Sequence, residues 1–466
     1  MKTIYKKKHY WCIVKKIFFL SFTFSMPACD SFLDVDLPKS QLTNTTVFQD
    51  YTTANAAMAD VYSKIRDKGL LTGTLVGLTS QLGNYTDELT FYGSATSATF
   101  GFYTNQVLPS NTTVALFWNN SYNQIYAANA VLEGVRPSTF SHQQKAQLEG
   151  EALFVRGLLH FYLLQLFGEI PYIETTDYRI NSVVTRMSTT EVYTHIITDL
   201  KTAENLLLPV YSGTERVRAN SFAVKALLAR VYLYVSKWGD ANKLATSVIE
   251  NNSLYVFENN LNKVFLKNST EAIWQFMPAL AGKNTDEGAF FIFTSGPPSL
   301  VSLSESLLNS FTVNDLRKTA WTGSVSNGIR TWSYANKYKE PRNTSTSREY
   351  SMVLRLTEQY LIRAEARAEL GDLIGAKEDL NKIRKRAGLT DIIASSKEEI
   401  LEAIFQERRK ELFTEYGHRF FDLKRTGKLD TILSLKTGWN TTDNLLPIPE
   451  SELTLNPNLK PQNPGY

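Results

Sequence analysis

With 466 residues, 43% of them hydrophobic, the chain is long enough to enclose a large core and, by length alone, two or three domains. Its two cysteines, Cys12 and Cys29, are too few for a disulfide framework or a thiolate metal site. The formal net charge of +4 comes from lysines in residues 1–28, which contain no acidic residue. The rest of the chain is slightly acidic, so its charge gives no indication of a nucleic-acid partner.

Near the start of the chain, Lys15 and Lys16 are followed by an apolar run of about ten residues and by a small residue, Ala28, directly before Cys29. This order is typical of a secretory signal peptide, and its Ala-Cys ending resembles a bacterial lipoprotein signal, although Met26-Pro27 departs from the usual residues. We predict that residues 1–28 are removed and that Cys29 becomes the lipidated first residue. Two alternatives remain: an ordinary signal peptide with an incidental cysteine, and an apolar N-terminal helix.

The next segment, residues 30–46, alternates acidic and apolar residues before turning polar, which predicts an extended leash docked on the body. Beyond it, apolar residues recur at spacings of three and four, the pattern of amphipathic helices. The predicted helices are residues 48–66, 114–135, 142–167, 189–208, 221–237, 241–251, 358–370, 374–387 and 397 to about 416.

Between these helices lie segments without a helical period. Residues 69–116 are rich in Gly, Thr, Ser and Asn with scattered aromatic residues, so we expect a long loop region with short strands. Residues 254–328 read as mostly irregular or strand-like. The tail, residues 445–466, contains too much proline for regular structure.

One predicted helix pair has the spacing of a tetratricopeptide repeat. Small Ala364 and Ala376 lie on either side of the turn residue Gly371, and Leu380 and Ile383 continue the second helix. Residues 226–249 form a looser copy, and residues 159–208 a possible third with a long inserted turn; a generic helical hairpin is the alternative. We therefore predict a mainly α fold of tetratricopeptide-like helix pairs with long irregular loop insertions and few short strands.

Several motifs make a family resemblance specific, and they span essentially the whole chain after residue 28. They are residues 29–36 with Pro38, 154–157 through 166–171, 407–412 with Glu415, Gly417, Arg419, Asp422 and Leu423, and the closing 446–449. In content and order these motifs resemble the SusD/RagB family of Bacteroidetes.

The resemblance implies an outer-membrane lipoprotein that binds nutrients, usually glycans and sometimes peptides. It implies a SusD-like α-α superhelix in one compact globular unit, with an N-terminal region at residues 29–250 and a C-terminal region at 251–466. It also implies a partner, a SusC-like TonB-dependent barrel transporter, over which this protein forms a lid.

Motifs for catalysis or metal binding are absent from the sequence. The histidines are not spaced for a shared metal, so we expect them at the surface or at helix caps, and we predict no catalytic residue, metal or cofactor. The acidic cluster at residues 407–422 has two interpretations: a pair of carboxylates for glycoside hydrolysis, or a lattice of ion pairs. On a helix, Glu407, Glu411 and Glu415 would share one face, which favours ion pairs.

Aromatic residues in the irregular segments are the better candidates for ligand contact, because flat rings beside polar groups suit the apolar faces and hydroxyls of sugars. The first candidate patch is Tyr85, Asp87, Phe91, Tyr92, Phe102, Tyr103 and Asn105, and the second is Phe290, Phe291, Trp321, Trp332 and Tyr334. The alternative is that these rings pack their own loops. Trp118 and Tyr122 are assigned to the core because of their helical spacing.

These observations lead to one main functional hypothesis: a non-catalytic, lipid-anchored protein exposed on the cell outer membrane. It would bind oligosaccharide nutrients and deliver them to the SusC-like transporter. The same role with peptide ligands is one alternative, and a tethered glycoside hydrolase is another.

Overall fold

Residues 44–466 are described by a computed structural model, so the predicted signal peptide, Cys29 and most of the predicted leash lie outside the described residues. Residues 47–466 form one compact unit. Its first helices are α3 (Tyr51–Asp67), α6 (Thr112–Val135) and α7 (His142–Phe167), preceded by the short α2 (Asn44–Val47). Among the helices of the described residues, none is both long and apolar enough to cross a membrane.

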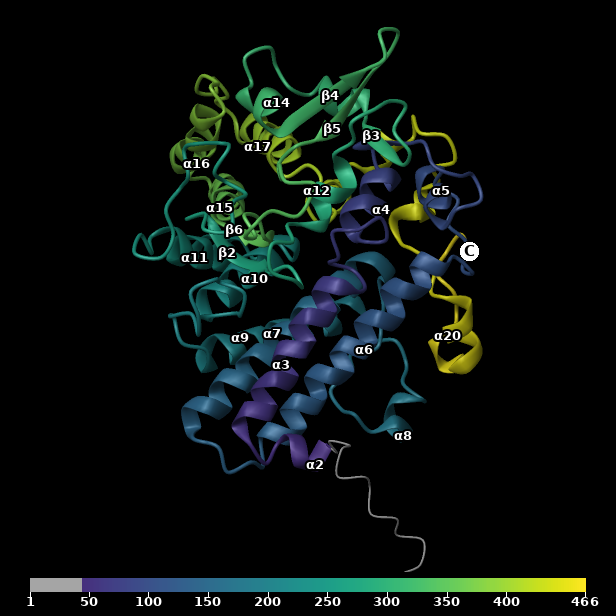
Figure 1. The fold of residues 1–466 in the computed structure, drawn as a ribbon, viewed down its shortest axis with the longest axis vertical. Coiled ribbons are helices and arrows are strands. Elements are labelled where there is room, and N and C mark those ends of the chain that lie inside the picture. The colour runs from purple at the N-terminus through teal and green to yellow at the C-terminus, as the bar shows by residue number, and fades with distance from the viewer. Residues whose placement is uncertain (1–43) are drawn as a thin grey trace, which may run out of the picture. The chain divides into compact units, whose positions relative to one another are not determined.

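A chain of antiparallel helices forms the body of this unit. Helix α7 packs on α6 and on α9 (Thr189–Leu206), and α10 (Ser221–Tyr234) packs on α9 and on α11 (Trp238–Ile249). Helix α11 then packs on α15 (Leu356–Glu369), although residues 250–355 separate them in sequence, and α16 (Leu373–Arg386) and α17 (Lys397–Glu411) follow. The superhelix therefore continues across a long insertion (Figure 1).

Local sequence signals determine where these helices begin. Ser141, Ser188 and Ser396 form capping boxes with the residue three positions later, at the starts of α7, α9 and α17. The prediction for residues 142–167 is confirmed residue for residue. The prediction that the last long helix reaches residue 416 is wrong: α17 ends at Glu411, and a turn with positive φ at Thr414 and Tyr416 separates it from α18 (His418–Arg425).

The pair α15–α16 shows the predicted close approach. The two helices pack on each other, Ala364, Ala376, Leu380 and Ile383 are all completely buried, and Gly371 has a φ of 87° at the turn. The predicted mainly α fold with tetratricopeptide-like pairs and few short strands is confirmed.

The segments expected to be irregular contain more regular structure than predicted. Residues 69–116 hold α4 (Leu78–Tyr85), β1 (Leu89–Phe91) and α5 (Ala98–Tyr103). The tail contains α20 (Glu450–Leu455) and η3 (Pro457–Leu459), and η2 (Thr441–Asn444) directly precedes it. These helices are one or two turns long, too short for a hydrophobic period to be recognised. The other short helices are α8 (Tyr178–Asn181), α12 (Asp286–Phe291), α13 (Glu305–Leu308), α14 (Leu316–Trp321) and α19 (Leu429–Leu433).

Three two-stranded antiparallel sheets complete the described residues. Strand β1 pairs with β3 (Val301–Leu303), β2 (Ala272–Phe276) with β6 (Ser351–Arg355), and β4 (Thr322–Ser326) with β5 (Thr331–Ala335). The main hydrophobic core lies among the helices and includes residues of β2 and β6. A separate cluster, which we call the second core, is formed mostly by the inserted segments; it contains Phe91, Phe291, Phe311, Trp321 and Phe413.

Candidate functional site

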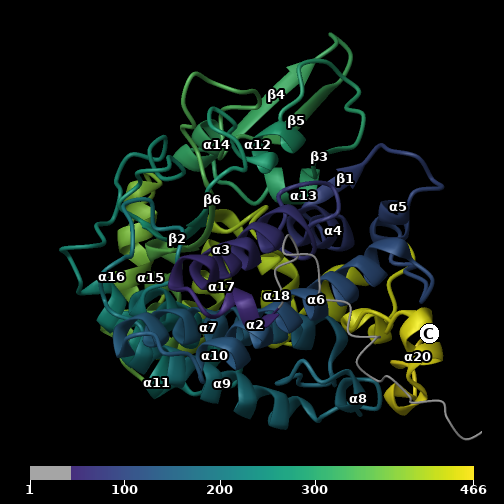
Figure 2. The ribbon, with the colours of Figure 1, turned by 60° about the horizontal axis from the view of Figure 1, so that its bottom comes forward.

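The second core joins the two aromatic patches predicted from separate parts of the sequence. Phe91 of the first patch and Phe291 and Trp321 of the second are buried in it together. The link between the segments is the β1–β3 ladder, in which Leu89 pairs with Leu303 and Phe91 with Val301. Figure 2 shows β1, β3, α12 and the β4–β5 hairpin gathered at one end of the view.

Part of each patch is buried. Tyr85, Phe102 and Trp321 are completely buried, Asn105 is 3% exposed, and Phe91, Phe291 and Trp332 are also buried. The Tyr85 hydroxyl donates to the Asp443 carbonyl at 3.0 Å, and Trp321 Nε1 donates to the Leu261 carbonyl at 2.9 Å. The polar atoms of Tyr85 and Trp321 therefore have partners within the protein. These buried side chains pack the interior and do not lie at a binding surface, contrary to the expectation from the sequence.

Asp87 of the first patch is held by two arginines. Arg419 Nε lies 2.8 Å from Asp87 Oδ1, and Arg409 Nη2 lies 2.6 Å from Oδ2. Burial alone would raise the pKa of Asp87, but hydrogen bonds from Arg419 and the two positive charges outweigh it and lower the pKa. This carboxylate ties the first patch to α17 and α18.

The rings that remain at least partly exposed around the second core form what we call the aromatic rim. Phe100 and Tyr103 contact Phe91, with centroids 6.4 and 6.1 Å away, and Phe293 contacts Tyr334 at 5.2 Å. Tyr92, at the end of β1, is 40% exposed. The rim consists of Phe100, Tyr103 and Phe290, which pack against the second core, and of Tyr92, Phe293 and Tyr334 from the same inserted segments. Phe100 and Phe293 were not among the predicted site residues. They are aromatic residues in the same irregular segments, so the criterion that selected the other rings could also have selected them.

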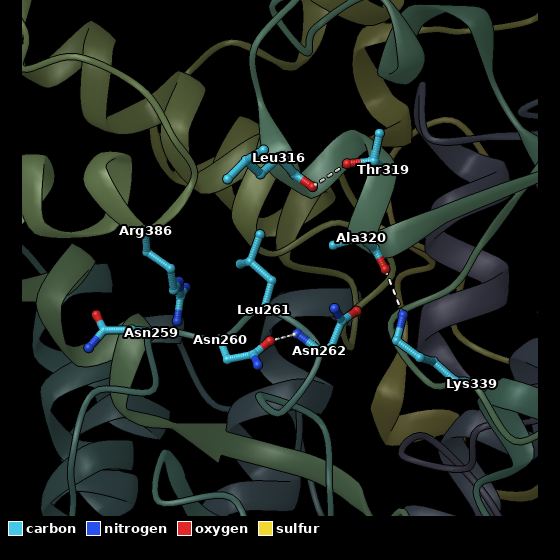
Figure 3. A pocket seen from close by; sticks show the side chains of 9 residues that line it. All are labelled: Asn259, Asn260, Leu261, Asn262, Leu316, Thr319, Ala320, Lys339 and Arg386. Carbon is cyan, nitrogen blue, oxygen red and sulfur yellow. Dashed lines mark hydrogen bonds between the residues drawn. The ribbon is translucent and has the colours of Figure 1, made fainter.

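A polar cavity of about 640 Å³ lies beside the second core (Figure 3). Asn259, Asn260 and Asn262 line it together with Lys339 and Arg386, which lie at opposite sides of the view. The Lys339 ammonium donates to the Ala320 carbonyl at 2.7 Å, so its position is fixed. Sequence reasoning missed this cavity, because its residues come from four separate segments. Its amides can exchange hydrogen bonds with hydroxyl groups.

Comparison with known proteins identifies the family. A family model described as "Starch-binding associating with outer membrane" matches residues 31–233, and one described as "SusD family" matches residues 311–466. This chain belongs to the SusD/RagB family.

Relatives of known sequence or structure match nearly the full length of this SusD/RagB protein. SusD-like protein P25 of Formosa agariphila is 24% identical, with 95% of this chain and 96% of the relative aligned. A SusD superfamily structure from Bacteroides vulgatus is 21% identical with a TM-score of 0.77, covering 90% of this chain and all of that one. A laminarin-binding SusD-like protein has the same TM-score at 24% identity and covers 89% and 99%.

The acidic cluster that carries part of the family resemblance is buried. Glu407 and Glu411 are completely buried, and Glu411 contacts Arg386 at 2.5 Å, Arg355 at 2.8 Å and Arg317 at 3.0 Å. Burial would raise the pKa of Glu411, but these arginines lower it well below its usual range. The ion-pair interpretation therefore describes the cluster. Other elements contribute most of the partners, although Glu407 also pairs with Lys410 of its own helix.

Glu415 lies outside the helix and does not share a face with Glu407 and Glu411, contrary to expectation. It follows the end of α17 and binds Lys337 at 2.5 Å and Arg355 at 2.8 Å. The expectation of surface or capping histidines is also wrong for His160, which is completely buried, and for His418, which is 5% exposed. Burial lowers the pKa of His160 to about 3, so its ring is a neutral hydrogen-bonding group that accepts from the Ile173 amide at 3.1 Å.

Proposed function

We propose that this protein is a lipid-anchored, surface-exposed outer-membrane protein that binds oligosaccharides at the aromatic rim and delivers them to a SusC-like TonB-dependent transporter. The observation that carries the proposal is the rim itself, because the partly exposed rings of Phe100, Tyr103 and Phe290, from two distant segments, pack against one second core. Such rings offer apolar faces to sugar C–H groups, and the asparagine-lined cavity beside the second core offers amides to hydroxyls. The laminarin-binding relative supports a glycan as the ligand class.

The burial and pairing of the acidic cluster argue against the alternative of a tethered hydrolase. A glycosidase needs two carboxyl groups that flank the bond to be broken, one of them able to act as an acid. Glu407 and Glu411 are buried and paired with arginines, so they offer neither access nor a free acid. We therefore propose a binding protein without catalytic activity, with peptides as the remaining alternative ligand.

Isothermal titration with laminarihexaose, other neutral hexasaccharides and a panel of peptides tests the proposal. We expect saccharide binding that weakens at least tenfold in the Tyr92→Ala/Tyr334→Ala double variant. Tyr178→Ala is the matched control, because Tyr178 is 77% exposed and lies on α8, away from the rim. Binding of peptides alone would replace the glycan assignment. Hydrolysis of a saccharide that is lost in Glu407→Gln would overturn the non-catalytic role.

Delivery to a transporter has its own test. We expect an affinity-tagged copy, expressed in its own bacterium and purified from detergent-solubilised outer membranes, to bring a TonB-dependent barrel with it. Recovery of the tagged protein without any barrel, in a detergent that keeps other membrane complexes intact, would contradict that part of the proposal.

A further inference from the structure

A second cavity lies on the superhelix, away from the aromatic rim. It measures about 610 Å³ and opens between α6, the end of α8 with the chain before and after that helix, and α20. Both ribbon views place α8 and α20 far from the β4–β5 hairpin (Figures 1 and 2). The volume lies within the range of small-ligand sites in proteins, which is roughly 300–1,000 Å³.

One wall of this cavity is a stripe of aromatic rings on α6. Trp118, Tyr122 and Tyr126 follow one another at intervals of four residues, so they lie on one helix face. Trp118 is 3% exposed, Tyr122 is half-buried and Tyr126 is 46% exposed, so the stripe runs from the interior to the surface. The Tyr122 hydroxyl donates to the Pro171 carbonyl at 2.9 Å, which fixes the middle ring. The assignment of Trp118 and Tyr122 to the core therefore missed their second role as cavity walls.

Amide groups stand beside the rings. Asn119 and Asn123 are exposed, and neither side chain has a hydrogen-bond partner within the described part of the chain. By contrast, Asn181 and Asn456 each donate to a backbone carbonyl at 2.8 Å and so hold the opposite wall in place. The cavity thus combines an aromatic wall with amide donors and acceptors that have no partner among residues 44–466.

The charges of the residues that line this cavity indicate which class of ligand it can bind. The described residues that line the cavity include one acidic residue, Glu452, and no lysine or arginine. A phosphate, a sulfate or an acidic sugar would therefore meet no positive charge there. A neutral saccharide fits, because its C–H faces can stack on Tyr122 and Tyr126 while its hydroxyls bond to the amides and to the carboxylate of Glu452.

We propose that this cavity is a second binding site for a short neutral saccharide, separate from the aromatic rim. The ligand class rests on the proposed function, but the location rests on the α6 stripe and its free amides. A second site on the same protein would hold a long glycan at two points, so that each contact raises the effective concentration of the other.

The test uses Tyr126→Ala and Asn123→Ala, because both side chains are exposed and their loss leaves the core intact. Each is made in the natural protein and in the rim-disabled Tyr92→Ala/Tyr334→Ala background. The control is Ile393→Ala, because Ile393 is fully exposed in the loop between α16 and α17 and does not line the cavity. Titration with laminarihexaose, cellohexaose, maltohexaose and xylohexaose should show binding that survives in the rim-disabled protein. That remaining binding should weaken at least tenfold in Tyr126→Ala and measurably in Asn123→Ala, but not in Ile393→Ala.

The possible outcomes separate this inference from the proposed function. If rim variants abolish all binding and the cavity variants bind like the natural protein, the second site is overturned and the rim proposal stands. If the cavity variants alone lose binding, the second site stands and the rim proposal fails. If no hexasaccharide binds at all, both are overturned.

Discussion

Phe91 pairs with Val301 across the antiparallel β1–β3 ladder. The ladder extends by one bond, in which the Tyr92 amide donates to the Leu300 carbonyl at 2.7 Å. Because of this pairing, rings that are far apart in the sequence, such as Phe91 and Phe291, share the second core. The aromatic rim therefore depends on a contact between two insertions into the superhelix, each of which forms only one strand of the sheet.

The buried ion pairs around Glu411 should be important for stability. Arg386 bridges Glu411 and Glu271, with each contact at 2.5 Å, and its side chain is completely buried. In Arg386→Met both carboxylates lose this partner inside the protein, and removing one member of a buried pair costs about 3–5 kcal/mol. We expect a loss of that size in the free energy of unfolding measured with urea.

Arg348→Met is the matched control, because Arg348 contacts Glu340 at 2.7 Å but its side chain is 61% exposed. Solvent screens such a pair, so we expect a loss below about 1 kcal/mol. Equal losses in the two variants would show that burial does not determine the contribution of these arginines.

The turn at Gly438 should tolerate no side chain. Its φ is 91°, and a Cβ atom there would lie 2.0 Å from the Thr104 carbonyl oxygen at the end of α5. Gly371 has a similar φ of 87°, but a Cβ there would meet no atom within 4 Å. We expect Gly371→Ala to lower the free energy of unfolding by about 1 kcal/mol through backbone strain alone. Gly438→Ala should lower it clearly more, because the clash adds to the strain. Thermal unfolding of both variants measures the difference; similar melting temperatures would contradict the predicted clash.

Sequence patterns predicted the long helices well, but they predicted poorly which aromatic side chains are exposed. Residues 142–167 carry their own period and capping signals, so their helix could be predicted from local sequence. Whether a ring in a glycine- and serine-rich segment is buried depends on its tertiary partners: Tyr92 is 40% exposed and neighbouring Phe91 is buried, because the second core lies on one side of β1. Helical spacing likewise assigns Trp118 to the core, but it cannot show that α20 leaves a cavity beside it.

The predicted lipid anchor can be tested through the two cysteines. If Cys29 carries the lipid, Cys29→Ala removes the acyl chains that hold the protein to the membrane, since stable anchoring needs more than one chain. We expect the variant to move from the membrane fraction to the soluble fraction on cell fractionation. Cys12→Ala should leave the distribution unchanged, because residue 12 belongs to the predicted signal peptide. Membrane retention of Cys29→Ala would contradict the anchor.

Glu287 should make the protein less stable as the pH rises. Its side chain is buried, and burial raises its pKa to about 7, although a hydrogen bond donated by Ser351 Oγ at 2.7 Å opposes the shift. Near pH 4.5 the carboxyl is largely protonated in the folded state and about half protonated when unfolded. Between pH 4.5 and 7 the unfolded chain loses its proton first, so the folded state becomes relatively less stable. The total change is about 3 kcal/mol, at about 1.4 kcal/mol for each pKa unit.

Glu287→Gln removes this titration while keeping a side chain of the same shape. Urea unfolding of both proteins at pH 4.5, 6 and 8 should show the variant gaining stability relative to the natural protein as the pH rises. Most of the gain should fall below pH 7. Above that pH the carboxyl is ionised in the folded state as well, so the unfolding free energy of the natural protein stops falling. A difference in unfolding free energy that stays constant across the three pH values would mean that the pKa of Glu287 is the same in the folded and unfolded protein and is not raised by burial. In that case its contacts with Ser351 and Tyr416 would have to offset its burial.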